Sequence, residues 1–139
     1  MIRPNEQYAY FTITGEFDPA EITARVGVIP TDSWKKGDLH PINRLERKFS
    51  RWSLYSRLER SCTIEDHIAD VLNQLSKNAE GFRSVSLEFG AQLDVIGHFH
   101  TDYPGLVLGR EQVAAIAEFA LKVDFDFYYM YAHRREDTD

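Results

Sequence analysis

The feature that most constrains the fold of this chain is a one-sided apolar stripe in residues 63–81. The intervening positions are mostly polar. The apolar residues recur every three or four positions and are Ile64, Ile68, Val71, Leu72 and Leu75. This spacing predicts an amphipathic helix, with Thr63 placed to cap its first turn. Because such a helix buries only one side, the chain must supply a second layer for it to pack against.

That second layer is predicted to be a β-sheet. In residues 7–16, Ala9, Phe11 and Ile13 alternate with Tyr8, Tyr10 and Thr12, which places the two sets on opposite faces of a strand. Further strands are predicted over residues 51–59, 82–90, 91–100 and 123–131. Trp52, Leu54 and Leu58 are expected on the buried side of the second strand, with Ser53, Tyr55 and Arg57 opposite.

Two more helices complete the predicted elements. Residues 17–27 contain Asp18 as the N-cap, Pro19 at the first helical position and Gly27 as the terminator. Residues 110–122 form the other helix, which begins after Gly109, and its expected buried positions are Val113, Ile116, Ala117 and Ala120. Residues 28–50 are polar and are predicted to form a long excursion with short strand pieces.

The order of these elements predicts an α+β fold. We expect a single-domain two-layer sandwich, a mostly antiparallel mixed β-sheet with about three helices packed on one face. The domain is expected to span residues 1–132, and the charged residues 133–139 are expected to form a frayed tail. A length of 139 residues fits one such domain.

Charge and cysteine content narrow the partners and the compartment. The formal net charge is -6, which disfavours nucleic acid and anionic membranes as partners and favours a basic protein. The chain contains no apolar run of the roughly 20 residues that a membrane helix needs. Its one cysteine, Cys62, is typical of a cytoplasmic protein, which is the expected location. A homodimer formed through a strand edge is also expected to be accessible.

Five segments of the chain, taken in order, resemble a known family. They are VGVIPTDSWKKGD (26–38), RWSLYSRL (51–58), EDHIADVLNQL (65–75), DYPGLVLGREQVAAIAEF (102–119) and KVDFDFYYM (122–130). Together they resemble the DUF4279 family, a bacterial domain of unknown function. The family pattern usually has a serine where Gly109 stands, and glycine can also serve as a helix N-cap. The resemblance supports the fold and implies no particular activity.

The preferred functional prediction concerns the face of the sheet that the helices leave open. That face is expected to carry aromatic and acidic side chains from several strands: Tyr8, Tyr10, Asp94, His98, His100, Asp126 and Tyr128. Trp34 and Lys35 belong to a loop that forms a contact patch or folds back on the core. The predicted binding surface is Tyr8, Tyr10, Trp34, Lys35, Asp126 and Tyr128. Such a surface suits a non-enzymatic protein, for example an immunity-type inhibitor that recognises a basic partner.

The alternative prediction is a divalent metal site, and with it a metal-dependent enzyme. His98 and His100 stand two apart in a predicted strand and would project to one side together with Asp94. Asp94, Asp102 or an acid on a neighbouring strand could be the third ligand. Imidazole and carboxylate are ligands for zinc and similar ions. Without this site no cofactor and no catalytic residue is expected. Cys62 and His67 are interpreted as an inert thiol and a surface histidine. A small-ligand pocket beside residues 28–50 is a third hypothesis.

Overall fold

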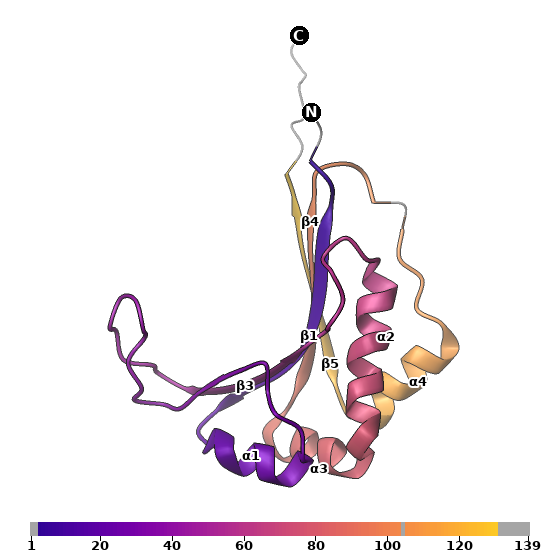
Figure 1. The fold of residues 1–139 in the computed structure, drawn as a ribbon. Coiled ribbons are helices and arrows are strands. Elements are labelled where there is room, and N and C mark those ends of the chain that lie inside the picture. The colour runs from indigo at the N-terminus through magenta and orange to yellow at the C-terminus, as the bar shows by residue number, and fades with distance from the viewer. Residues whose placement is uncertain (1–2, 104, 131–139) are drawn as a thin grey trace.

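The computed structural model describes residues 3–103 and 105–130, which form a five-stranded sheet with helices on one side (Figure 1). The strands lie in the order β2–β3–β1–β4–β5. β4 and β5 are parallel, and the other neighbouring strands are antiparallel. The strands are β1 (Glu6–Gly15), β2 (Asp32–Trp34), β3 (Ser50–Tyr55), β4 (Gln92–Phe99) and β5 (Lys122–Tyr129).

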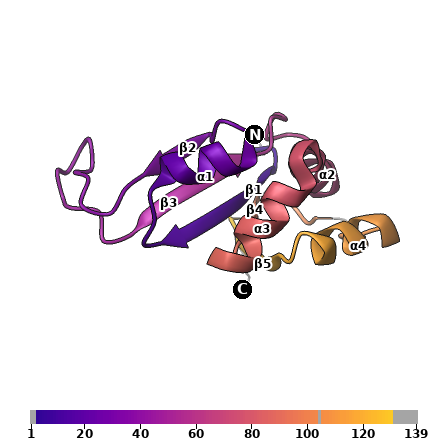
Figure 2. The same cartoon turned by 90° about the horizontal axis from the view of Figure 1, so that it is seen from below.

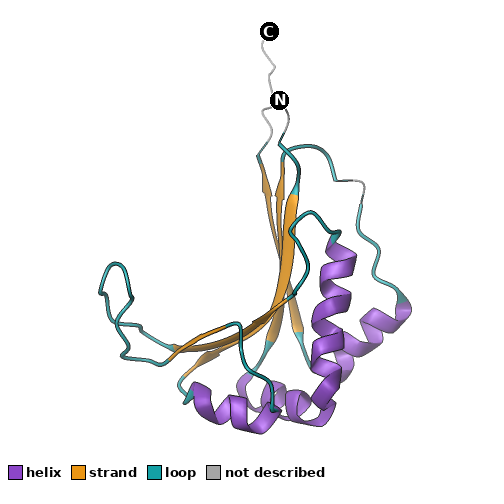
Figure 3. Ribbon diagram, viewed as in Figure 1, coloured by secondary structure: helices purple, strands orange, loops and turns teal. Residues whose placement is uncertain are grey.

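The helices all cover the same face of this sheet, as Figures 2 and 3 show. They are α1 (Pro19–Val26), α2 (Ile64–Leu75), α3 (Ala79–Phe89) and α4 (Arg110–Glu118), with a 3₁₀ turn η1 (Ser76–Asn78) between α2 and α3. The predicted α+β two-layer fold is therefore confirmed. The predicted tail, residues 133–139, lies outside the described residues. Within residues 3–103 and 105–130, no helix has the length and apolar character needed to cross a membrane.

The predicted helix caps are present at α1 and α2. Asp18 accepts a hydrogen bond from the backbone N–H of Ala20, and Gly27 adopts the left-handed conformation that ends α1. Thr63 accepts a hydrogen bond from the N–H of Asp66 at the start of α2. Gly109 occupies the N-cap position of α4, as predicted from its place before that helix.

Residues 82–89 belong to α3 and Gly90 ends that helix, so the prediction of a strand over residues 82–90 was wrong. Val85, Leu87 and Phe89 alternate with polar residues, which suggested period two. The side chains that the core receives are Phe82, Val85 and Ser86, which follow helical spacing, whereas Leu87 is 61% exposed. The chain turns into α3 at Asn78, whose side chain accepts from the N–H of Gly81.

The ends of two other elements also differ from the predictions. β3 stops at Tyr55, so Leu58 does not join its buried side and is an exposed residue. Arg57 instead reaches α2, where it forms an ion pair with Asp70 at 2.6 Å. Of the positions predicted to be buried in α4, Ile116 is buried, whereas Val113 and Ala117 are exposed. Phe119, just after the helix, is buried in addition.

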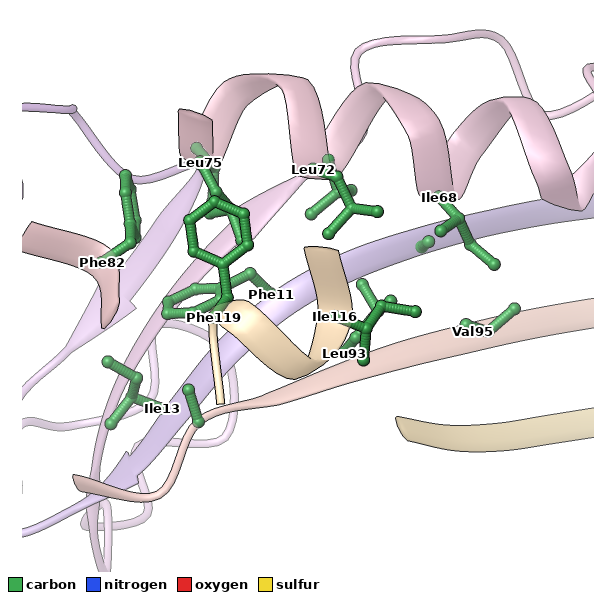
Figure 4. Close-up of a cluster of buried hydrophobic side chains, with 14 of the residues drawn as sticks. Phe11, Ile13, Ile68, Leu72, Leu75, Phe82, Leu93, Val95, Ile116 and Phe119 are labelled. Atoms are coloured by element: carbon green, nitrogen blue, oxygen red, sulfur yellow. The ribbon is translucent and has the colours of Figure 1, made fainter. Parts of the chain in front are cut away.

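The core lies between the helices and the sheet (Figure 4). Strand residues such as Phe11 and Leu93 meet helix residues such as Ile68 and Leu75, and all four are fully buried. The ring of Phe11 contacts Phe82 edge-on, with centroids 5.3 Å apart. This core uses only one face of the sheet, which leaves the opposite face free of helices.

Candidate functional site

One face of the sheet has no helix against it, and we call it the open face (Figure 3). In β1, Ala9, Phe11 and Ile13 are buried in the core, so the residues between them lie on the opposite side. The strand register extends this surface across the sheet. Its members are Asp32 and Trp34 of β2, Arg51, Ser53 and Tyr55 of β3, Tyr8, Tyr10 and Thr12 of β1, Asp94, Ile96 and His98 of β4, and Lys122, Asp124, Asp126 and Tyr128 of β5.

Three tyrosines from two neighbouring strands form the centre of the open face. The ring centroids of Tyr10 and Tyr55 are 4.4 Å apart, and Tyr8 stacks at 6.2 Å from Tyr10 and 6.0 Å from Tyr55. Arginines lie against this cluster, with Arg51 5.2 Å from the Tyr10 ring and Arg60 4.2 Å from the Tyr8 ring. These contacts hold the rings in fixed positions, so that a partner meets a preorganised aromatic surface.

Trp34 extends the aromatic surface to the edge of the sheet. Its indole N–H donates to the carbonyl of Phe49, and the guanidinium of Arg47 lies 3.7 Å from its ring centroid. Lys35 follows β2 and is exposed, and its backbone N–H donates to the carboxylate of Asp38. Trp34 thus joins the other predicted surface residues on the open face, and Lys35 lies at its border.

Acidic residues gather on the β4–β5 half of the open face. The register places Asp94 directly beside Asp124, with Asp126 two residues further along β5. None of these three carboxylates has an ion-pair partner among the described residues. Burial, together with the nearby charge of Asp124, raises the pKa of Asp94 above its usual range. We call Asp94, Asp124 and Asp126 the acidic half of the open face.

The tyrosine hydroxyls next to these acids are held in their neutral form. Burial and the charge of Asp94 raise the pKa of Tyr10 to about 12. The hydroxyl of Tyr128 donates to Asp126 at 2.9 Å, and this hydrogen bond raises the pKa of Tyr128. Both hydroxyls therefore stay protonated near neutral pH and can donate hydrogen bonds, whereas neither is poised to act as a base.

The three predicted metal ligands are not brought together. Asp94 and His98 share the open face but stand four residues apart in β4, a separation of about 13 Å along an extended strand. His98 stacks on Tyr128 with ring centroids 5.1 Å apart, and His100 follows the end of β4. Across residues 3–103 and 105–130, no three His, Cys, Asp or Glu side chains form a group that could hold a metal ion.

Metal binding by this histidine pair stays a prediction with a direct measurement. Elemental analysis of the freshly purified protein should then find about one divalent ion per chain, because a structural site of this kind retains its ion. The double variant His98→Ala, His100→Ala should lose it. Purified protein that contains no metal and takes up no zinc would contradict this alternative.

One hollow that bears on the small-ligand hypothesis lies in residues 34–49. It has a volume of about 240 Å³, and its lining includes Trp34, His40 and Phe49. This volume is below the roughly 300–1,000 Å³ typical of ligand pockets. A second hollow, between α1 and residues 29–33, has a volume of about 560 Å³ and lies within that range; its lining includes Thr23, Ile29 and Asp32. The small-ligand hypothesis therefore stays a prediction beside that of the open face.

His67 is buried, so its interpretation as a surface histidine was wrong. The residue is 0% exposed, and its Nδ1 forms a hydrogen bond with the hydroxyl of Ser56. The same hydroxyl accepts from the N–H of Leu58, which fastens the segment after β3 to α2. Burial lowers the pKa of His67 below the 6.5 of the free side chain, because the charged imidazolium is poorly solvated there. Cys62 is partly exposed.

The buried imidazole predicts that the protein loses stability in mild acid. The folded state resists protonation of His67, so the free energy of unfolding should fall as the pH drops below about 6.5. Urea unfolding at pH 7.5 and pH 5.5 would measure the loss. His67→Asn removes the titrating group and should make the two midpoints more alike. An unchanged pH dependence in His67→Asn would contradict this assignment.

Sequence reasoning missed the arginines of the open face, although one signal was available. Arg51 stands two positions before Ser53 in β3, and residues two apart in a strand lie on the same side. Its place on the open face could therefore be predicted from the sequence. Arg47 and Arg60 lie outside the strands, and only the folded chain brings them to Trp34 and Tyr8. The open face is therefore mixed in charge, with arginines toward β2 and β3 and acids toward β4 and β5.

Comparisons with known proteins identify one family. The family model described as a domain of unknown function, DUF4279, matches residues 5–130. This range runs from the start of β1 to the end of β5 and includes every element of the sheet and the helical layer. Among curated proteins and among solved structures, none matches the chain significantly.

Proposed function

The chain belongs to the DUF4279 family, and from the geometry of its open face we propose that it is a non-enzymatic protein that binds a basic protein partner. The specific role that we propose is that of an immunity-type inhibitor in the bacterial cytoplasm. The single cysteine supports that compartment. The inhibitor role adds the expectation that binding blocks an activity of the partner.

One observation carries this proposal, namely that the carboxylates of the acidic half lie close together without an ion pair among the described residues, although Asp94 and Asp126 accept hydrogen bonds from Gln92 and Tyr128. Like charges directly opposite each other on neighbouring strands destabilise a sheet, and Asp94 and Asp124 stand in that relation. A lysine or arginine from a partner would relieve the repulsion. Since none of these acids serves the core or an ion pair within the described residues, binding explains their position better than folding does.

The tyrosine cluster supplies the contact area that such a complex needs. Tyrosine and tryptophan are enriched at protein interfaces because they cover large areas while losing little side-chain entropy. Tyr8, Tyr10 and Tyr55 are already stacked, so their ordering does not have to occur on binding. The cluster lies next to the acidic half, because Tyr10 pairs with Asp94 in the register.

The proposal predicts binding of a labelled lysine- and arginine-rich peptide, measured by fluorescence anisotropy. The double variant Asp124→Asn, Asp126→Asn should weaken binding about tenfold or more, because two charge pairs are lost. Affinity should also fall as salt is added. The matched control Glu80→Gln, Glu111→Gln removes the same charge from the helical layer and should bind as the wild type does. Equal weakening by both double variants, or no binding by the wild type, would contradict the proposal.

A further inference from the structure

Residues 35–49 form a projecting arm between β2 and β3. The arm is an ordered hairpin, in which Gly37 donates to the carbonyl of Arg47, Arg47 donates to that of Asp38, and Leu39 forms an isolated bridge with Glu46. Figure 1 shows the arm extending away from the helices and from the body of the sheet. We refer to residues 35–49 as the arm.

The arm is basic and apolar, in contrast to the acidic chain that carries it. It contains five basic residues against two acidic ones: Lys35, Lys36, Arg44, Arg47 and Lys48, against Asp38 and Glu46. Lys36 pairs with Glu16, whereas Lys35, Arg44 and Lys48 are exposed and form no ion pair within the described part of the chain. At the tip, Ile42 is 86% exposed and Leu45 is 67% exposed. Exposed aliphatic side chains flanked by charges are typical of a contact surface.

The acidic half of the open face has the opposite charge, and the arm of the same molecule cannot reach it. The arm leaves the sheet at the β2–β3 edge, and the acidic half lies at the β4–β5 edge, with β1 between them. The sheet also bends, so that the open face lies on the inner side of the bend and the arm extends outward from its far end (Figures 1 and 3). A second molecule is therefore needed to bring the two surfaces together.

We propose that two copies of this chain pair with their open faces together, so that the arm of each lies against the acidic half of the other. A two-fold axis parallel to the strands places the β2 edge of one copy over the β5 edge of its partner. The arrangement is isologous, and both complementary contacts form twice. The arm and open face together offer about as many residues as a standard interface takes from one side, roughly 20–30.

The aliphatic tip of the arm can contact one exposed ring on the open face. Tyr128 of β5 is 45% exposed and stacks on His98, whereas Ile96 is only 7% exposed and offers little surface. One residue at each edge carries the opposite charge to its surroundings, Asp32 on β2 and Lys122 on β5. The same two-fold axis brings these edges together as well, so the pairing stays complementary in charge.

This inference goes beyond the proposed function and does not rest on it. The dimer nevertheless affects the proposed function, because a basic partner and the arm of a second copy would compete for the acidic half. The dimer would then be the resting form, and binding of the partner would release monomers. Self-association and peptide binding are separate measurements, so either can fail while the other stands.

The test is sedimentation velocity of the purified full chain over a range of concentrations at low salt. The wild type should sediment with twice the 16.1 kDa mass of the chain and dissociate as salt is added. The arm variant Lys35→Glu, Arg44→Glu, Lys48→Glu and the face variant Asp124→Lys, Asp126→Lys should each raise the dissociation constant about tenfold or more. A chain that carries both sets of substitutions should dimerise again, because the charges are exchanged rather than removed.

A control variant with charge reversal on the helical side, Lys77→Glu with Arg110→Glu, should dimerise as the wild type does. Circular dichroism of each variant confirms that it is folded. A wild type that is monomeric at every concentration would overturn the proposal, and so would failure of the doubly reversed chain to recover the dimer. A monomer whose arm binds vesicles of anionic phospholipid would also overturn it, since the arm would then serve a membrane surface.

Discussion

Replacing Phe11 by Ala is expected to lower the free energy of unfolding by about 3–5 kcal/mol, a large fraction of the stability of a domain of this size. Phe11 is fully buried at the centre of β1, and its ring makes edge contacts with Trp52 and Phe82. Truncation leaves a cavity that neither the sheet nor α3 can close without moving. Urea denaturation followed by circular dichroism would measure the loss.

Tyr10→Ala is the matched control, because Tyr10 precedes Phe11 in the strand and points to the open face. Its ring stacks only on other open-face residues, so we expect a loss of about 1 kcal/mol. The two values together test whether the protein folds on one face of the sheet alone. A comparable loss of stability in both variants would show that the open face also belongs to the folding core.

Gly81→Ala is expected to lower the free energy of unfolding by about 1–3 kcal/mol, because the contact between α1 and α3 leaves no space for a methyl group. A Cβ at this position would lie 2.8 Å from the carbonyl oxygen of Arg25 and 2.7 Å from Nδ2 of Asn78. The Asn78 amide also donates to the carbonyl of Val26 and so joins the two helices. The sign of the change in the free energy of unfolding is informative, because Gly→Ala in a solvent-exposed helix would stabilise the protein by about 1 kcal/mol.

Leu87→Ala in the same helix provides the comparison. Leu87 is exposed, and both residues favour helices, so the change should alter the free energy of unfolding by no more than about 0.5 kcal/mol. Thermal unfolding of both variants would be sufficient. A neutral or stabilising effect of Gly81→Ala would contradict the close packing of α1 on α3.

The open face could be predicted largely from the period of the strands. The alternation of Tyr8, Ala9, Tyr10 and Phe11 assigns each residue to one side, and the same rule places Asp126 and Tyr128 together on β5. The same rule gave a wrong strand over residues 82–90. Apolar residues at 85, 87 and 89 fit the alternation of a strand, but the residues that are buried are Phe82, Val85 and Ser86, which fit the spacing of a helix. Short apolar segments are ambiguous in this way.

Contacts between strands could not be predicted, because they depend on strand order and register. Asp94 and Asp124 are 30 positions apart, and nothing in the sequence shows that β4 and β5 pair in parallel with these residues adjacent. The same holds for Arg47 and Arg60, whose loops bring them to aromatic rings only in the folded chain. The division of the open face into an acidic and a basic half is therefore a result of the fold.

The measurement that tests the central claim most directly is a nuclear magnetic resonance titration of isotope-labelled protein with the lysine- and arginine-rich peptide. If the open face is the recognition surface, the backbone resonances that shift should belong to β4, β5 and the strands that carry Tyr8, Tyr10 and Tyr55. The resonances of α1 to α4 should change little, since these helices lie on the far side of the sheet. Two results would contradict the account: resonance shifts confined to the helices, or no resonance that shifts and saturates as the peptide is added.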